Sequence, residues 1–194
     1  MAYLLALAGG AGSGKSTLAA ALGEELPGTM VVHLDAHVHR DTTAAPCVPV
    51  IGGVGLTVDF SDPGSVNREE TEAAVDAALA TAPHLVIVEG TFALTLPYIR
   101  DRARWTAYLS VPADIRLARK TVRKLSAGQN PLPGLQGYLL RARAAHDHHV
   151  EPMEQAAQLV LDGTAPVPDL VRGLRNFLAP QSSGPHQPAA RPFG

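Results

Sequence analysis

Nine residues near the start of the chain, Gly9 to Thr17, constrain its fold more than any other stretch. They read Gly-Gly-Ala-Gly-Ser-Gly-Lys-Ser-Thr and fit the pattern G-x-x-x-x-G-K-[ST] of a phosphate-binding loop. A continuous apolar run, Tyr3 to Ala8, precedes them, as a buried parallel strand would. Leu18, Leu22 and Leu26 follow at helical spacing. The stretch thus stands between a strand and a helix, which favours a phosphate loop over a chance glycine-rich turn.

This arrangement supplies binding groups for a nucleoside triphosphate. Glycines let backbone N–H groups turn toward phosphates, and the following helix adds the partial positive charge of its N-terminus. Lys15 can reach the β- and γ-phosphates, and the Ser16 hydroxyl can join the shell of a Mg²⁺ ion. The candidate ATP-binding residues of the loop are Gly9, Gly10, Ala11, Gly12, Ser13, Gly14, Lys15, Ser16 and Thr17.

Composition narrows the class of protein. The chain has 194 residues, of which 46% are hydrophobic, enough to bury the core of one domain. The net charge of −2 argues against a general nucleic-acid or membrane-surface binder. Eight of the sixteen Lys and Arg residues fall between Arg100 and Lys124, which indicates a local anion site.

Cysteine usage and hydropathy point to a soluble cytoplasmic protein. Cys47 is the only cysteine, so neither an intramolecular disulfide nor a cysteine-based zinc cluster is expected. No apolar run reaches the roughly 20 residues that span a membrane, and no secretory signal precedes the phosphate loop. The oligomeric state stays open.

Alternating strands and helices predict an α/β fold, a five-stranded parallel sheet with helices on both faces. We expect one domain over residues 1–179, with a helical lid at about 116–134 and a disordered tail over 180–194. Residues 36–68 are expected to be mostly loop. The expected strands cover residues 3–8, 30–35, 85–90, 105–111 and 158–162. We expect a flexible link over residues 126–134 and a further helix over 135–150.

Two carboxylates, Asp35 and Glu89, close two of these strands. Ligands of such sheets bind at the carboxyl ends of the strands, where the phosphate loop also lies. One carboxylate can accept a hydroxyl proton, and either can hold a water of a Mg²⁺ shell. The alternatives are a turn or capping role for Asp35 and a backbone-paired buried carboxylate for Glu89.

Arg116, Arg119 and Arg123 share one face of an amphipathic helix. Its apolar stripe is formed by Ile115, Ala118, Val122 and Leu125. Such a face can neutralise phosphate charge or stack on adenine, or it can be an ordinary solvated basic surface. We interpret the histidines at 146, 148 and 149 as solvated surface rather than as a metal site. His37 and His39 are candidates for either a substrate contact or loop packing.

Several further motifs resemble the uridine kinase and phosphoribulokinase group of P-loop kinases. Residues 34–41 are similar to its second-strand motif, in which the Asp is the catalytic base, and 60–63 resemble its Phe-Asp-His-Pro element. Residues 86–90 resemble its Val-Val-Glu-Gly strand, whose Glu helps to hold Mg²⁺. Residues 113–123 are similar to its lid helix, and 150–152 to a later Val-Glu-Pro.

The resemblance implies a P-loop kinase fold with ATP and Mg²⁺ as cofactors and a small molecule as phosphate acceptor. It implies catalytic roles for Asp35 and Lys15, Mg²⁺ binding by Ser16 and Glu89, and ATP binding by Arg116 and Arg119 together with the loop. We expect phosphorylation of a hydroxyl, with a nucleoside as the first choice. The alternatives are another small acceptor (a sugar, vitamin or specialised metabolite) and an ATPase or switch without such an acceptor. The residues expected at the acceptor are Asp35, His37, Ser61, Asp62, Arg123 and Gln136.

The chain departs from that group where the acceptor would bind. Uridine kinases carry an aromatic-rich hairpin between Phe-Asp-His-Pro and the Glu-Gly strand, whereas residues 63–85 have room for one helix. The family's sugar-binding Asp falls on Ser61, and the aromatic pair after the catalytic Asp is replaced by His37 and Val38. The segment Arg-Gly-Arg-Asp has become residues 128–131, Gly-Gln-Asn-Pro. The ATP half of the motif set is retained and the acceptor half is altered.

Overall fold

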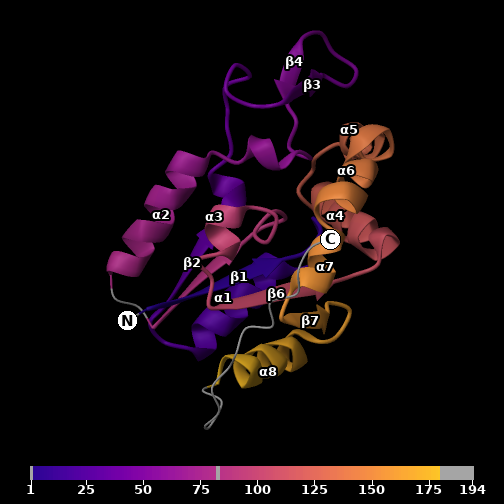
Figure 1. Ribbon diagram of the computed structural model, residues 1–194. Helices are drawn as coiled ribbons and strands as arrows, with labels where there is room; N and C mark the ends of the chain where they lie inside the picture. Colours follow the sequence, from indigo (N-terminus) through magenta and orange to yellow (C-terminus); the bar gives the residue numbers. More distant parts are fainter. Residues whose placement is uncertain (1, 82–83, 180–194) are drawn as a thin grey trace, which may run out of the picture.

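The computed structural model describes residues 2–81 and 84–179, and a five-stranded parallel sheet forms its centre (Figure 1). The strand order is β2-β5-β1-β6-β7, and every neighbouring pair is parallel. This confirms the α/β fold and the five strands expected from the sequence. The tail expected over 180–194 lies outside the described residues. The strands are β1 (Tyr3–Ala8), β2 (Thr29–His33), β5 (Leu85–Glu89), β6 (Trp105–Ser110) and β7 (Leu159–Asp162).

The central strands are buried on both faces, which explains their unbroken apolar sequences. Leu5 and Leu7 of β1 point to one face and Leu4 and Ala6 to the other, and none of them is more than 3% exposed. Successive side chains of a strand alternate between faces, so a strand covered on both sides must be apolar throughout. The register aligns Leu7 with Glu89, which brings the ends of β1 and β5 together.

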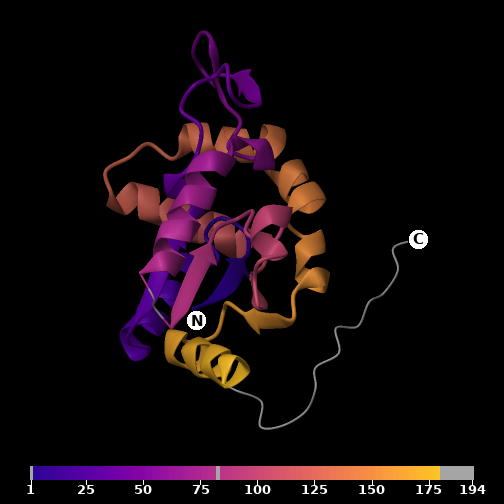
Figure 2. The same ribbon diagram turned by 60° about the vertical axis from the view of Figure 1, so that its left-hand side comes forward.

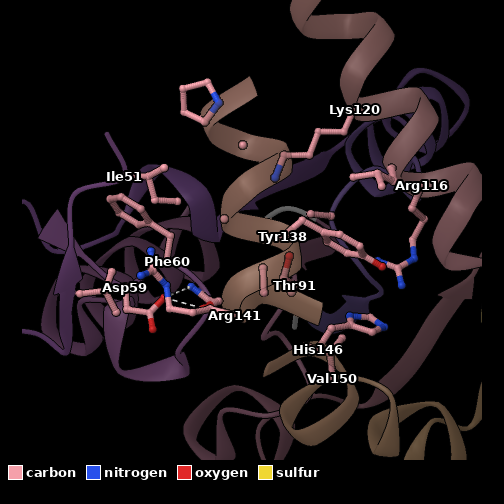
Figure 3. A pocket seen from close by; sticks show the side chains of 18 of the residues that line it. Ile51, Asp59, Phe60, Thr91, Arg116, Lys120, Tyr138, Arg141, His146 and Val150 are labelled. Carbon is pink, nitrogen blue, oxygen red and sulfur yellow. Dashed lines mark hydrogen bonds between the residues drawn. The ribbon is translucent and has the colours of Figure 1, made fainter. Parts of the chain in front are cut away.

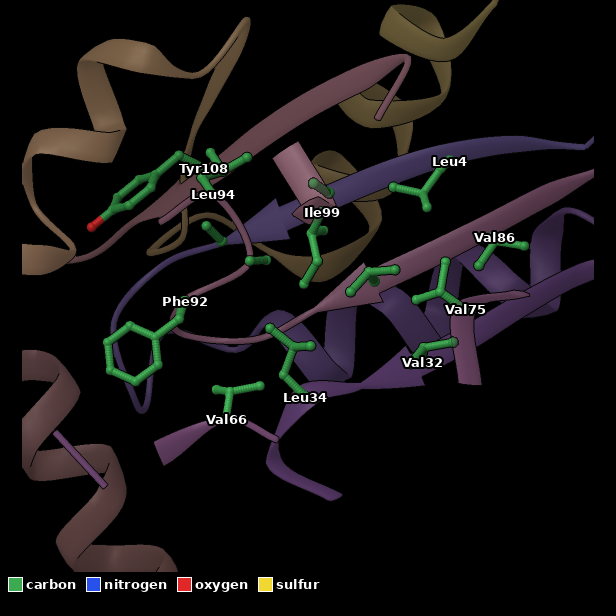
Figure 4. Packing of buried hydrophobic residues seen from close by; sticks show 14 of the residues in the cluster. Leu4, Val32, Leu34, Val66, Val75, Val86, Phe92, Leu94, Ile99 and Tyr108 are labelled. Atoms are coloured by element: carbon green, nitrogen blue, oxygen red, sulfur yellow. The ribbon is translucent and has the colours of Figure 1, made fainter. Parts of the chain in front are cut away.

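Helices cover both faces of the sheet (Figures 1 and 2). Helices α1 (Lys15–Glu25) and α8 (Val167–Leu178) pack on one face. Helices α2 (Arg68–Ala80), α3 (Pro97–Arg100) and α7 (Pro152–Ala156) pack on the other. Figure 4 shows part of this second core, where Val75 of α2 and Ile99 of α3 lie against strand residues. Among the described residues, no helix has the length and apolar character needed to cross a bilayer.

The segment 36–68 contains more regular structure than expected. An antiparallel hairpin, β3 (Cys47–Pro49) and β4 (Leu56–Val58), stands away from the body of the molecule (Figures 1 and 2). Short 3₁₀ turns, η1 (Leu34–Ala36) and η2 (Pro63–Ser65), flank the segment that carries it. Proline and glycine in and between these short strands mask the alternating pattern, which is why the sequence predicted a loop.

A train of helices continues from β6 around one end of the molecule (Figure 2). It consists of α4 (Ala113–Ser126), α5 (Leu132–Gly137), the π-helical turn η3 (Tyr138–Ala142) and α6 (Arg143–His149). The link expected over 126–134 is therefore shorter, because α4 includes Ser126 and α5 begins at Leu132. The expected helix over 135–150 is divided by the π turn.

The burial of α1 and α4 generates a stability prediction. Leu22→Ala removes a fully buried side chain from the α1 face of the core and should lower the free energy of unfolding by about 2–5 kcal/mol. Leu125→Ala on α4, where the side chain is 58% exposed, should change it by less than about 0.5 kcal/mol. Urea unfolding followed by circular dichroism measures both. Equal losses in the two variants would contradict this placement of the core.

Candidate active site

The phosphate loop is held in shape by close backbone contacts that only glycine permits. Gly9 has φ +146°, and a Cβ there would lie 2.6 Å from the carbonyl oxygen of Leu109. Gly12 has φ +86°, and a Cβ there would lie 2.5 Å from the carbonyl oxygen of Arg116. A side chain at either position would meet rigid backbone in a conformation that L residues avoid. The loop therefore fits tightly between β6 and α4 and leads into α1 at Lys15.

Helix α4 turns its arginine face, not its apolar stripe, toward the loop. Arg116 is 8% exposed and its Nε donates to the carbonyl oxygen of Val111 at 3.0 Å. Arg119 Nη1 donates to the carbonyl oxygens of Ser13 at 3.3 Å and Gly163 at 3.1 Å. Val122 and Leu125, on the predicted apolar stripe, are exposed. Arg119 thus holds the loop backbone at Ser13, and Arg116 packs against the loop at Gly10.

A cavity of about 240 Å³, which we call the phosphate cavity, opens over the loop and the ends of β2 and β5. It brings together Lys15, Ser16, Asp35, Glu89 and Arg123, the residues that the sequence assigned to catalysis, metal and phosphate. Asp35 lies in η1 and is exposed to this cavity. The remaining residues that line it are Ala11, Gly12, Gly14, Thr17, Thr91, Arg119 and Lys120.

Lys15 is buried and folds back on its own loop. Lys15 is only 7% exposed, and its Nζ donates to the carbonyl oxygen of Gly10 at 3.2 Å. Burial lowers the pKa of Lys15, while the nearby carboxylates of Glu89 and Asp35 act in the opposite direction. An ammonium surrounded in this way is positioned to exchange a backbone carbonyl for a phosphate oxygen.

Glu89 and Ser16 meet directly. The Ser16 hydroxyl donates to Glu89 Oε1 at 2.8 Å, and His33 Nδ1 lies 2.6 Å from the same oxygen. Both contacts use Oε1, so neither occupies Oε2. Among the described residues, no group of three or more His, Cys, Asp or Glu side chains could hold a metal ion. One carboxylate beside one hydroxyl fits Mg²⁺, which takes few protein oxygens and completes its shell with water and phosphate.

A second space, which we call the apolar cavity, adjoins the first and has a volume of about 340 Å³ (Figure 3). The β3–β4 hairpin and the segment after it form one side, and α4 and the train from α5 to α6 form the other. Ala11, Thr91 and Lys120 line both cavities, so the two meet beside the phosphate loop. Most of its wall is apolar and includes Val48, Ile51, Val58, Phe60, Phe92, Leu117, Pro133 and Val150.

The apolar cavity contains polar side chains that the sequence analysis did not single out. Asp59 precedes the predicted Ser61, and its Oδ1 accepts a hydrogen bond from the Ser61 N–H at 3.0 Å. Arg141 comes from the π turn, and Lys120 neighbours the predicted Arg119 on α4. Burial and the adjacent cations Lys124 and Arg123 lower the pKa of Lys120. Of Asp59, Arg141 and Lys120, only Lys120 had a signal in the sequence, which is its position within the basic helix.

The remaining predicted residues lie in different surroundings. Ser61 lines the apolar cavity. Asp62 caps η2, where its Oδ1 accepts from the Gly64 N–H at 2.7 Å. His37 ends η1, and Gln136 is exposed on α5; neither is among the residues that line the three cavities found. Their contacts with an acceptor stay predictions.

His146 lies deeper than its expected place on the surface. It lines both the apolar cavity and a third cavity of about 240 Å³, which Asp147, Glu151 and Glu154 also line. Burial, with a smaller effect of the Arg116 guanidinium, lowers the pKa of His146 to about 4. The imidazole is therefore neutral at pH 7, and it adds no charge to the apolar cavity.

This shift gives a pH-dependent prediction. Between pH 6.5 and 4 the unfolded chain binds a proton at His146 that the folded chain does not, so this group makes stability fall as the pH falls through that window. His146→Gln should flatten the slope of unfolding free energy against pH there. His148→Gln, at an exposed position two residues after His146, is the control and should keep the wild-type slope. Identical slopes for wild type and His146→Gln would contradict a buried neutral imidazole.

Comparison with known proteins finds distant relatives. No family model matches the chain. A uridine kinase from Deinococcus deserti is 24% identical over an alignment of 184 residues. The match covers 82% of this chain and 86% of that enzyme. A uridine kinase from Macrococcus caseolyticus is 31% identical over 78 residues, which cover 40% of this chain and 38% of that enzyme.

Solved structures share the fold at lower identity. A sugar kinase from Janibacter sp. superimposes with a TM-score of 0.61 at 18% identity and covers 92% of this chain and 95% of its own. A shikimate kinase from Acinetobacter baumannii, in complex with shikimate, has a TM-score of 0.55 at 22% identity and covers 92% and 93%. The chain is thus a distant relative of the uridine kinases and has the fold of the P-loop small-molecule kinases.

Proposed function

We propose that this protein transfers the γ-phosphoryl group of ATP to a hydroxyl of a small molecule. The observation that carries the proposal is the junction of two cavities: one holds Lys15, Ser16, Asp35 and Glu89, and the other is a largely apolar space beside it. A donor of phosphate and an acceptor of matching size could then meet at the shared wall. Phosphoryl transfer needs chiefly such positioning together with compensation of charge.

The phosphates would lie on the loop. Helix α1 begins at Lys15 in the wall of the phosphate cavity, where the first N–H groups have no partner within the helix and the helix adds its N-terminal partial charge. Lys15 would release the Gly10 carbonyl to bind phosphate oxygens, and Arg123 would add positive charge from α4. Arg119 and Arg116 would contribute to ATP binding mainly by fixing the loop, since Arg119 donates to the Ser13 carbonyl and Arg116 packs against Gly10.

Asp35 would orient the acceptor hydroxyl and accept its proton. It lies in the phosphate cavity close enough to Lys15 and Lys120 for its charge to oppose the burial that lowers the pKa of each ammonium. A carboxylate at this place can take the proton as the oxygen attacks the γ-phosphorus, while the bond from phosphorus to the bridging oxygen breaks and ADP leaves.

Ser16 and Glu89 would hold Mg²⁺, with Glu89 acting directly or through water. The ion, when bound, would neutralise developing charge on the phosphate oxygens. His33 would keep Glu89 in place through Oε1 and leave Oε2 toward the cavity. This role of His33 had no signal in the sequence.

A nucleoside is the acceptor suggested by the distant similarity to uridine kinases. A second candidate, another small hydroxyl compound, is favoured by the wall of the apolar cavity. A hairpin before Phe60 builds part of that wall, in place of the hairpin that uridine kinases carry after this element. A nucleotide switch without a small acceptor is less favoured, since it gives no role to the cavity next to Asp35.

Two substitutions test the proposal. Lys15→Ala should abolish turnover, because it removes the only buried ammonium at the phosphates in the described chain. Asp35→Asn should lower kcat by about 10²–10⁴ while ATP affinity stays within a few-fold, because it removes the base and keeps the shape. ADP release across a panel of nucleosides, sugars and vitamins, combined with ATP titration, measures both effects.

Asp41→Asn is the matched control, since Asp41 is an exposed carboxylate six residues away that bonds only the Thr43 N–H. It should leave turnover unchanged. Near-normal turnover of Asp35→Asn would remove Asp35 as the base.

A further inference from the structure

The cations around the apolar cavity differ in what else they contact. Three of its lining side chains are basic: Arg116, Lys120 and Arg141. Arg116 is tied to the Val111 carbonyl and packs on the phosphate loop, and Lys120 also lines the phosphate cavity. Of the three cavities described, Arg141 lines only the apolar cavity. It is therefore the cation that the phosphates of ATP do not explain.

Arg141 is presented by an unusual piece of backbone. The turn η3 is π-helical, and three of its five residues, Tyr138, Arg141 and Ala142, line the apolar cavity. Single π turns inside helices occur often at functional sites, because they re-aim side chains that an α-helix would direct elsewhere. Figure 3 shows Arg141 on the side of the cavity formed by Asp59 and Phe60, away from Lys120 and Arg116.

In the described part of the chain, the guanidinium of Arg141 forms no ion pair, although Asp59 lies on the same side of the cavity (Figure 3). No hydrogen bond joins it to another described side chain either. The Oδ1 atom of Asp59 is engaged by both the N–H and the hydroxyl of Ser61, and His146 is neutral. Arg141 is partly exposed and lines a largely apolar space, so its guanidinium is available to hydrogen-bond an anionic ligand that enters the cavity.

We propose that the phosphate acceptor is a small hydroxyl compound that bears an anionic group, a carboxylate or a phosphate monoester, and that Arg141 binds this group. That the acceptor has a hydroxyl rests on the proposed function. That it also bears an anionic group rests on Arg141. The anionic end lies toward the hairpin, where a guanidinium can make two parallel hydrogen bonds. The apolar wall holds the carbon frame, Asp59 accepts from a second hydroxyl, and the reacting hydroxyl lies near Thr91 and Lys120 at the junction with the phosphate cavity.

The test compares anionic probes with neutral probes of the same shape. The probes are quinate, pantoate and glycerol 3-phosphate, each paired with quinamide, pantoamide or glycerol. Binding is measured by calorimetry with a non-hydrolysable ATP analogue and Mg²⁺ present, and turnover by ADP release. At least one anionic probe should bind at least about 10-fold more tightly than its neutral partner, which corresponds to one charge-assisted contact.

Variants assign the preference to Arg141. Arg141→Gln should reduce the preference for the anionic probe by about 10–100-fold, and Arg141→Lys should retain part of it. Arg143→Gln, two residues along at an exposed position, should keep the wild-type preference. ATP affinity should be unchanged in all three variants. Whichever binds more tightly to the wild type, a carboxylate probe or the phosphate probe, identifies the kind of anionic group.

The outcomes separate this inference from the proposed function. Turnover of neutral probes alone, or an anionic preference that survives Arg141→Gln, would overturn the role of Arg141 and leave a kinase. Binding of anionic probes that depends on Arg141 but yields no phosphorylated product would support the role of Arg141 and count against phosphoryl transfer. Absence of binding by all six probes would overturn the inference.

Discussion

The contact between the phosphate loop and helix α4 is the constraint on which the site depends. Arg116 and Arg119 donate to backbone carbonyls at Val111, Ser13 and Gly163, and the loop approaches so closely that a Cβ at Gly12 would collide with the α4 backbone. Charge-assisted hydrogen bonds of this kind are among the stronger ones in proteins. They fix the loop between sheet and helix before any ligand arrives, so its N–H groups need little reorganisation to bind phosphate.

That contact also divides the site into two parts with different chemistry. On the sheet side, β1, β2 and β5 end together and bring Lys15, Asp35 and Glu89 into one polar cavity. On the helix side, α4 forms one wall of an apolar cavity whose other wall is the hairpin and the segment after it. The polar part holds the motifs that resemble those of the uridine kinase group, and the apolar part includes the segments where the sequence departs from that group.

Sequence reasoning succeeded where local pattern and tertiary structure impose the same demand. The runs at 3–8 and 85–89 had to be continuous because both sheet faces are covered, and the loop glycines had to be glycine because of backbone contact. It failed where contacts between residues distant in sequence determine which side chains are buried. The periodicity of α4 identified its two faces, but not that the arginine face would meet backbone carbonyls while Val122 stays exposed.

The acceptor side was less predictable for the same reason. Asp59, Arg141 and His146 come from three segments that meet only in the fold, and a π turn aims one of them. The hairpin escaped detection because its strands have three residues each and one of them, β3, ends in proline. Short strands of this kind gain their order from packing, which here includes Ile51 beside Gly137 of α5.

The fate of the γ-phosphoryl group tests the central claim most directly. ATP labelled with ¹⁸O in its γ-phosphate would be incubated with the protein and the acceptor panel, and the products would be analysed by mass spectrometry. The account predicts that the label appears in a phosphate ester of a small hydroxyl compound, and that Lys15→Ala removes that product. Label found only in inorganic phosphate, at a rate that no acceptor changes, would contradict it.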